Sequence, residues 1–239
     1  YDVSLVREGR IPWTRETWLG QRFRGHMTGF PSVDVKSIGA GGGSIAWVDT
    51  GGLLHVGPQS AGSSPGPVCY DSGGIEPTVT DCALILGYID PLFFLGGAMQ
   101  LNEKKAKAAI EQKVSEVLKI SVEDAAQSVL ALATEKMVGA IEEITVNQGI
   151  DPKSACLIGG GGAAGLNANA VAKRLGCSKA IIPNIGAALS AGGALMSDLS
   201  SEFAQISFSS GKEVISLNHE SFDRALYSEG ALTAAKWLV

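Results

Sequence analysis

Two glycine-rich segments and one acidic segment contain the residue types in this sequence that are best suited to chemistry. The first segment, Gly39–Ser44, has four glycines in its first five residues and joins two strand-like runs. Backbone N–H groups in such a turn can point at phosphate oxygens, because Gly41, Gly42 and Gly43 have no Cβ atom to block the approach. Ser44 adds a hydroxyl. The alternative is an ordinary tight hairpin, although hairpins rarely need so many glycines.

The second glycine-rich segment, Gly159–Gly165, follows a short strand pattern and opens a helix, so a ligand can lie at the helix N-terminus. Gly160, Gly162 and Gly165 match the G-x-G-x-x-G spacing of dinucleotide-binding turns. That fingerprint also needs an acidic residue about 20 positions later to bind the ribose. Residues 152–197 contain no Asp or Glu, which argues against a nicotinamide site. A G-x-x-x-x-G-K-[ST] phosphate loop is absent as well.

The acidic segment is Glu76-Pro77-Thr78-Val79-Thr80-Asp81, which carries two carboxylates and two hydroxyls. Asp81 could hold a metal-bound water or act as a base. The alternative is that Thr80 or Asp81 caps a helix that begins near Cys82, and spacing alone favours this cap. Both hypotheses remain open from the residues themselves.

Histidines and cysteines form no recognisable site. His26, His55 and His219 stand alone, and His55 lies in a strand-like run, where it is expected to be structural. The four cysteines form no C-x-x-C pair and have no histidine at metal-ligand spacing. This pattern is typical of reduced thiols in a cytoplasmic protein.

The elements that must position these residues change type along the chain. Strand patterns dominate the first part, at 1–6, 33–38, 44–48 and 53–56, with an ordered Gly/Pro loop at 57–77. Helices and short strands alternate after that, with strands at 155–158, 179–182 and 202–208. The order predicts an α/β fold with a mixed sheet and flanking helices. We expect a strand-rich part at 1–100 and a helical and α/β part at 101–239, together one incomplete domain of a larger subunit.

Helix boundaries are marked by capping residues. Asn102 is expected to cap one helix, and Ser121, with Asp124 in the capping-box position, begins a long one that stops near Gly149. A helix of small residues runs from about Ala163 to Gly176. Further helices are expected at about 187–196 and 221–239.

Composition excludes several classes of partner. The net charge is −5 and no basic patch with interleaved aromatic residues occurs, which argues against nucleic acid. Segment 180–197 is uncharged, but its proline and glycines suit a buried turn and helix better than a membrane span. No signal peptide is recognisable at Tyr1. The 45% hydrophobic content supports a sizeable core.

Several long motifs, in order, resemble the hydantoinase A / 5-oxoprolinase / acetone carboxylase family. The resemblance covers most of residues 31–205. It is carried by Ser37–Asp49, Val56–Gly62, Pro65–Tyr70, Glu76–Asp81, Leu95–Gly97, Gly159–Gly165 and Leu189–Gly193.

This resemblance implies one lobe of the actin / sugar-kinase / chaperone ATPase fold, with ATP and Mg²⁺ as cofactors. Gly41, Gly42, Gly43 and Ser44 would form the second phosphate turn. Gly160, Gly161 and Gly162 would approach the adenosine, and Asp81 would supply the catalytic and metal-binding carboxylate.

Three departures from the family pattern stand out. Gly39 replaces an acidic residue that related ATPases place before the glycine triplet, and Asn167 stands where many members have a histidine. The Asp-x-Gly-Gly-Thr hairpin of the family's N-terminal lobe is not found, so we expect that lobe to be missing from this chain.

Three functions follow as expectations. The first is an ATP-dependent amidohydrolase subunit that phosphorylates a cyclic amide, a small-molecule substrate, and works with a hydantoinase B-type partner subunit. The second is a subunit of an acetone- or acetophenone-type carboxylase. The third is a non-catalytic assembly module of the same fold.

Overall fold

The computed structural model describes residues 1–16, 18–19, 24–27, 29, 32–196 and 204–219. Contacts within the chain divide it into residues 1–190 and residues 191–239. Each unit is described by itself. Both glycine-rich segments belong to the first unit.

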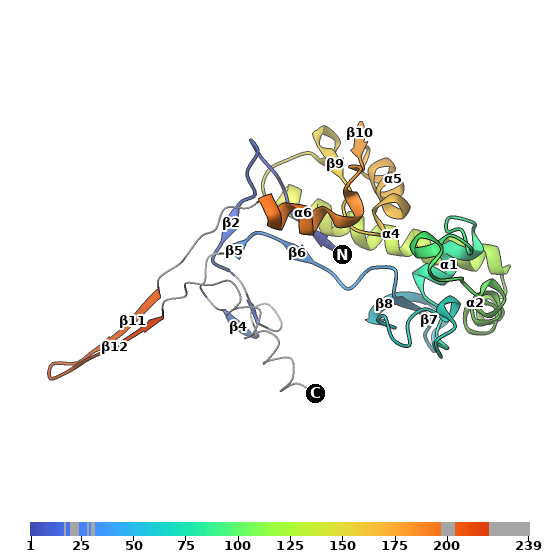
Figure 1. The fold of residues 1–239 in the computed structure, drawn as a ribbon, viewed down its shortest axis with the longest axis horizontal. Coiled ribbons are helices and arrows are strands. Elements are labelled where there is room, and N and C mark those ends of the chain that lie inside the picture. The colour runs from blue at the N-terminus through green and yellow to red at the C-terminus, as the bar shows by residue number, and fades with distance from the viewer. Residues whose placement is uncertain (17, 20–23, 28, 30–31, 197–203, 220–239) are drawn as a thin grey trace. The chain divides into compact units, whose positions relative to one another are not determined.

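The described strands pair in twos (Figure 1). Five pairs are antiparallel: β1 (Asp2–Val3) with β6 (Lys36–Ser37), β2 (Trp13–Thr14) with β5 (Ser32–Val33), β3 (Trp18–Leu19) with β4 (His26–Met27), β7 (Ser44–Val48) with β8 (Leu54–Ser60), and β11 (Ala204–Ser209) with β12 (Val214–His219). One pair, β9 (Cys156–Ile158) with β10 (Lys179–Ile181), is parallel. The α/β class is confirmed, but the described strands do not join into one mixed sheet.

Six α-helices occur in the described residues. They are α1 (Val79–Ile85), α2 (Glu103–Ile110), α3 (Glu116–Leu118), α4 (Val122–Val146), α5 (Ala164–Leu175) and α6 (Leu189–Met196). A π-helical turn at Glu111–Ser115 links α2 to α3, and short 3₁₀ turns lie at Val68–Tyr70, Phe94–Gly97, Pro152–Ser154 and Gly186–Ala188. None of these helices is long and apolar enough to span a bilayer.

Helix α4 is the scaffold of the first unit. Ser121 caps it, because the Ser121 side chain accepts a hydrogen bond from the amide of Asp124 at 3.0 Å. Apolar residues on α4 then repeat at helical spacing, so α4 packs against α1, β8 and α5 (Figure 1). Helix α4 also contacts β6, which precedes the first glycine turn, so it packs against elements next to both turns.

Two hydrophobic clusters divide α4 between its neighbours. The N-terminal half contributes Val122, Ala125, Ala126, Val129 and Ala133 to a core with residues of β7, β8, α1, α2 and the π-turn. The C-terminal half contributes Met137, Val138 and Ile141 to a second core that includes Ala40, Val171 and Leu175. Met137 is only 1% exposed.

The predicted capping residues agree with the structure where it is described. The Asn102 side chain accepts from the amide of Lys105 at 3.1 Å, and Gly176 ends α5 with a positive φ of 74°. The strand β12 was not predicted. The helix predicted at 221–239 lies outside the described residues.

Candidate nucleotide-binding turns

The first glycine turn is closed by Ser44. The Ser44 amide donates to the carbonyl of Gly41 at 3.0 Å, and the Ser44 Oγ accepts from the amide of Gly41 at 2.9 Å. Ser44 is buried, with 4% of its surface exposed. Its hydroxyl therefore stabilises the turn, and a contact from Ser44 to a ligand remains a prediction.

Two other segments hold the carbonyl groups of this turn. The Gly42 carbonyl accepts from both the amide and the Oγ1 of Thr80, each at 2.9 Å. The Gly43 carbonyl accepts from the amide of Ala61 at 2.9 Å. The turn is thus fixed from outside by the start of α1 and by the loop after β8.

The amides of Gly42 and Gly43 donate no hydrogen bond to any group in the part of the chain that the structure describes. Buried or half-buried backbone N–H groups are nearly always paired in folded proteins. Successive unpaired N–H groups in a turn form an anion-binding concavity. The first glycine turn therefore has the donors that a phosphate group needs.

The space around each glycine differs. A Cβ atom at Gly42 would lie 2.8 Å from the Oγ1 of Thr80, and one at Gly43 would lie 2.8 Å from the Oγ of Ser60. A Cβ atom at Gly41 would meet nothing within 4 Å. A side chain at position 42 would require Thr80 to shift and one at position 43 would require the exposed Ser60 side chain to rotate, whereas position 41 leaves room for a side chain.

Asp81 follows Thr80, which contacts this turn, and is part of a helix cap. The Asp81 carboxylate accepts from the Thr78 amide and the Thr78 Oγ1, both at 2.8 Å, and the Thr78 side chain accepts from the Asp81 amide. This reciprocal pattern is a capping box. The helix therefore begins at Val79, three residues before the position expected from the sequence, and its N-cap is Thr78 instead of Thr80 or Asp81.

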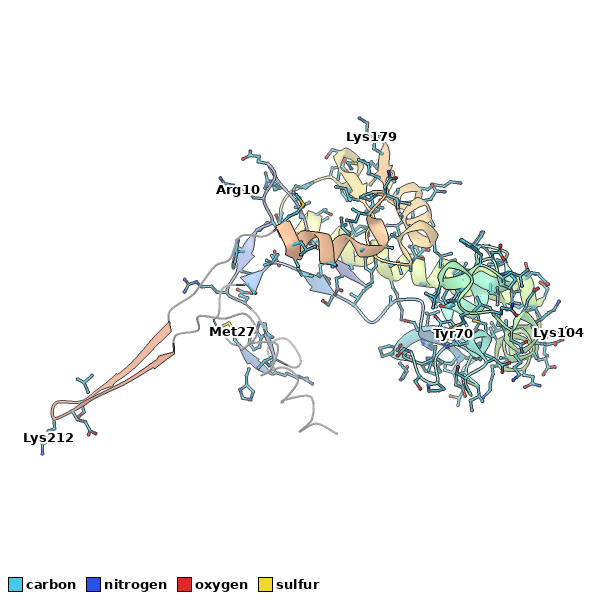
Figure 2. All side chains as sticks on the ribbon, in the orientation of Figure 1. Arg10, Met27, Tyr70, Lys104, Lys179 and Lys212 are labelled. Carbon is cyan, nitrogen blue, oxygen red and sulfur yellow. The ribbon has the colours of Figure 1, made fainter. Side chains whose placement is uncertain are left out.

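The same carboxylate also holds the preceding loop. It accepts from the amides of Val68 and Cys69 at 3.2 and 2.7 Å, and Asp81 has no exposed surface. Tyr70, which is labelled in Figure 2, ends this loop. It packs with Phe94 and other apolar residues around α1 and α2. In this structure four polypeptide donors surround Asp81, so its surroundings satisfy a carboxylate without a cation. Its catalytic and metal-binding roles remain predictions.

Buried thiols next to Asp81 are poor nucleophiles. Burial, and then the charge of Asp81, raise the pKa of both Cys69 and Cys82 far above the ordinary thiol value. Protonated thiols are inert. Among the described residues, no group of three or more His, Cys, Asp or Glu side chains is arranged to hold a metal ion.

The second glycine turn connects β9 to α5. The Gly159 amide donates to the carbonyl of Ile181 at 2.9 Å, and the Gly161 amide donates to the carbonyl of Gly186 at 2.7 Å. Gly161 has a φ of +96°, a conformation that L-amino acids rarely adopt. These contacts fix the turn against the segment after β10.

The N-terminus of α5 is open to a ligand. Its N-cap, Ala163, makes no side-chain capping hydrogen bond, and the amides of Gly160 and Gly162 have no acceptor within the described residues. Gly160, Gly161 and Gly162 are exposed. A Cβ atom at Gly162 would meet nothing within 4 Å, whereas one at Gly160 would lie 2.5 Å from Leu189 Cδ2. Unpaired N–H groups and the helix dipole suit a polar ligand here.

Both turns are anchored on the same part of α4. Ala40, which immediately precedes Gly41, packs in one cluster with Met137 and Ile141 of α4. Val171 and Leu175, on the helix that follows the second turn, belong to the same cluster. The structure therefore brings together, on one scaffold, the two turns that the sequence singled out.

His55 is structural, as expected from its position in a strand. It lies in β8, its Nε2 is 2.7 Å from Asp49 Oδ2, and its ring stacks on Trp47 with centroids 4.4 Å apart. The hydrogen bond from His55 and the amide of Leu53 lower the pKa of Asp49. This cluster stabilises the β7–β8 hairpin at the end remote from the glycine turn.

Sequence reasoning missed the connection between Thr80 and Gly42. The segment 76–81 was identified for its carboxylates, and its hydroxyls were considered only as helix caps. A hydrogen bond between residues 38 positions apart leaves no local signal. The sequence therefore gives no indication that the segment 76–81 contacts the glycine turn at 39–44.

The class is an α/β protein in which two glycine turns pack against one long helix, α4. Comparisons with known proteins give the family. The family described as Hydantoinase/oxoprolinase matches residues 1–203. The chain belongs to this hydantoinase/oxoprolinase family, as its motifs indicated.

Relatives include both hydrolases and carboxylases. The chain is 42% identical over 199 residues to the caprolactamase subunit alpha of Pseudomonas jessenii, covering 83% of this chain and 28% of that protein. It is 43% identical over 164 residues to the acetophenone carboxylase gamma subunit of Aromatoleum aromaticum, covering 68% and 22% respectively. It is 33% identical over 248 residues to the 5-oxoprolinase PfmaA of Pestalotiopsis fici, covering 96% and 19%.

Solved structures agree with these relatives. The ATP-dependent caprolactamase from Pseudomonas jessenii matches with a TM-score of 0.74 at 40% identity, over 86% of this chain and 29% of that one. Nucleotide-free acetone carboxylase matches with a TM-score of 0.75 at 29% identity, over 89% and 30%. The chain thus spans less than a third of the length of the relatives it matches.

Proposed function

We propose that this chain is the nucleotide-binding part of an ATP-dependent amidohydrolase subunit of the hydantoinase/oxoprolinase type. The observation that carries the proposal is the first glycine turn. Its Gly42 and Gly43 amides are unpaired within the described residues, while its carbonyls are held by Thr80 and Ala61. Support comes from a relative and a solved neighbour that are described as a caprolactamase, the latter as ATP-dependent.

The residues present fit ATP. The amides of Gly42 and Gly43 would bind phosphate oxygens, and Gly41 would allow their close approach. The exposed Gly160–Gly162 turn would receive the adenosine at the open N-terminus of α5. We further propose that these turns belong to one lobe of an actin / sugar-kinase / chaperone ATPase fold, with the other lobe outside this chain.

The chemistry requires activation of an unreactive ring amide. ATP, when bound, supplies the phosphoryl group that turns the amide oxygen into a leaving group and makes the carbon electrophilic. Phosphoryl transfer depends mainly on positioning and on stabilising negative charge. The N–H groups of Gly42 and Gly43 provide fixed positive dipoles for this charge. The carbonyls of the same two peptides, those of Gly41 and Gly42, are held by Ser44 and Thr80, so the dipoles need little reorganisation.

Magnesium does not fit the carboxylate predicted for it. Both oxygens of Asp81 already accept hydrogen bonds from backbone or hydroxyl donors, and the residue has no exposed surface. The described residues offer no other cluster of metal ligands. No step is therefore assigned to Mg²⁺ on the described residues of this chain.

A carboxylase function is the second candidate, because the acetophenone carboxylase gamma subunit is 43% identical over 164 residues, close to the 42% over 199 residues of the caprolactamase subunit. The two functions use the same ATP turns and differ in the substrate that is activated. Both relatives are named as subunits, which supports a partner subunit, and we propose a hydantoinase B-type partner for the amidohydrolase. The third possibility, a non-catalytic assembly module, predicts no turnover.

One experiment separates these functions. ATP hydrolysis by the complete protein with its partner subunit would be measured against hydantoins, lactams, and ketones with bicarbonate. Stimulation by a ring amide is the expected result. Stimulation by a ketone only when bicarbonate is present would establish the carboxylase instead. If no compound of the panel stimulates ATP hydrolysis, both enzyme functions would be contradicted and the assembly module would be favoured.

A further inference from the structure

Thr80 contacts the first glycine turn in a way that none of the predicted site residues does. Its amide and its Oγ1 donate to the same acceptor, the Gly42 carbonyl, each at 2.9 Å. Thr80 is 7% exposed, so water competes little for these hydrogen bonds. One residue of α1 thus fixes one carbonyl of the turn twice.

The geometry of the peptide bond gives this contact a consequence for the ligand. The Gly42 carbonyl and the Gly43 N–H belong to one planar trans peptide and point in opposite directions. Because Thr80 holds the carbonyl on the side of α1, the N–H of Gly43 must point to the opposite side. Within the first glycine turn, the amides of Gly42 and Gly43 are the two that have no acceptor among the described residues.

Glycine makes such an anchor necessary. A peptide flanked by Gly42 and Gly43 is flexible, because glycine has access to many backbone conformations. The neighbouring peptide is fixed in the same manner, since the Gly41 carbonyl accepts from the Ser44 amide at 3.0 Å and thereby directs the Gly42 N–H. The Thr80 hydroxyl, which lies outside the turn, adds a side-chain hydrogen bond that holds the Gly42 carbonyl.

We propose that Thr80 is a positioning residue for the phosphate groups of ATP, acting through the Gly42–Gly43 peptide without touching the nucleotide. This inference rests on the proposed ATP site and adds a residue to it. The Oγ1 of Thr80 keeps the Gly43 N–H directed at the phosphate, so the effect of losing it depends on the presence of phosphate groups in the ligand.

Neighbouring Thr78 provides a matched control. Thr78 is also a buried threonine at the start of α1, but its Oγ1 donates to the Asp81 carboxylate and not to the turn. Loss of the Thr78 hydroxyl removes the helix cap and lowers stability. A merely structural role for Thr80 would give the same behaviour as Thr78.

The test compares pairs of variants that differ by one oxygen atom. Thr80→Ser and Thr80→Ala, and Thr78→Ser and Thr78→Ala, would be made in the complete protein, and the Kd values of ATP and adenosine would be measured by calorimetry well below each melting temperature. Thr80→Ala is expected to weaken ATP about fivefold relative to Thr80→Ser, the factor typical of one hydrogen bond, and to leave adenosine unchanged. For Thr78, we expect the ratio of the ATP Kd to the adenosine Kd to be the same in Thr78→Ser and Thr78→Ala.

The outcomes separate this inference from the proposed function. A wild-type protein that binds ATP no more tightly than adenosine would contradict the phosphate turn itself. A wild-type protein that prefers ATP, together with equal ATP affinity in Thr80→Ser and Thr80→Ala, would overturn the positioning role alone. Equal weakening of ATP and adenosine would assign Thr80 a structural role and would also overturn it.

Discussion

The two glycine turns are similar in composition but are built in different ways. The first is half-buried, and its carbonyls are held by Thr80, Ala61 and Ser44, which come from three different parts of the chain. The second is exposed, and its described contacts are backbone hydrogen bonds to Ile181 and Gly186. The first turn is therefore held by contacts on several sides, whereas the second is exposed to solvent between β9 and α5.

This difference shows that glycine serves two purposes here. At Gly42 and Gly43 an added Cβ atom would displace the side chains of Thr80 and Ser60, so packing alone disfavours any residue but glycine. At Gly41 and Gly162 a side chain would meet nothing within 4 Å and no positive φ is involved, so the fold does not require glycine. Glycine at the second pair of positions is what the proposed approach of a ligand would require. Substitutions can separate the two purposes.

The largest effect is expected from Gly42→Val in the first turn. Its side chain would displace Thr80, whose Oγ1 lies 2.8 Å from the added Cβ, and would release the Gly42 carbonyl that Thr80 holds, so the Gly43 N–H would lose its orientation. We expect ATP-dependent turnover to fall at least about a hundredfold, the scale for removing oriented N–H donors. Unfolding free energy should fall by about 2 kcal/mol, because the site is overpacked.

Gly41→Val is the matched comparison for that variant. Its Cβ atom has open space, so urea unfolding should give a stability close to that of the wild type, while turnover is lost to a similar degree. Steady-state kinetics and denaturation on both variants test this. Normal turnover in Gly41→Val would show that no ligand approaches this side of the turn.

Asp81→Asn is expected to have the next largest effect, and it acts on stability. An amide group cannot accept four hydrogen bonds as the buried carboxylate does, and its NH₂ would face the N–H donors of Val68, Cys69 or Thr78. We expect a loss of about 3 kcal/mol of unfolding free energy. Melting curves measure it, and Mg²⁺ titration of turnover is the second measurement. A raised Mg²⁺ requirement without loss of stability would support the metal-binding prediction for Asp81.

Sequence patterns were most informative where the chain is locally determined. The caps Asn102, Ser121 and Gly176 and the strand Ser44–Val48 follow from residue types within a few positions, and the structure confirms them. Hydrogen bonds across long separations, such as Thr80 to Gly42, depend on tertiary packing and have no local signature. Asp81 is an intermediate case, because its partner Thr78 is local while Val68 and Cys69 are 13 and 12 residues away.

Gly162→Val tests the open turn and should have a smaller effect. The added side chain fits the fold, so unfolding free energy should change by no more than ~0.5 kcal/mol. The side chain would occupy space next to the unpaired amides of the α5 N-terminus, and we expect adenosine binding to weaken about tenfold, or ~1.4 kcal/mol.

Gly139→Ala, at an exposed position of α4 with no atom near its Cβ, is the control and should leave nucleotide binding unchanged. Calorimetric titration with adenosine measures both variants. If Gly162→Val binds adenosine like the wild type, the ligand does not reach the second turn, and the comparison between the turns loses its functional meaning.

The thiols also differ between the two regions, and their effect on stability is expected only at high pH. Cys82, which follows Thr80 and Asp81 in α1, is buried in the core with residues of β7, β8 and α4, whereas Cys156, in β9 before the second turn, is exposed. Burial raises the pKa of Cys82, so above the ordinary thiol pKa of about 8.5 the folded chain retains a proton that the unfolded chain loses. Stability must therefore decrease as pH rises, by up to ~1.4 kcal/mol per pH unit for this one thiol.

Urea unfolding of the wild type and of Cys82→Ala at pH 8, 9 and 10 isolates that contribution, since other titrating groups are common to both proteins. The difference in unfolding free energy between them should shrink as the pH rises, because the alanine variant lacks the thiol. A thiol reagent at neutral pH should modify Cys156 in the folded protein and Cys82 only after denaturant is added. A constant difference across this pH range, or rapid modification of Cys82 without denaturant, would mean that the first turn rests on a looser core than the structure shows, and the contrast between a rigid and an open turn would no longer hold.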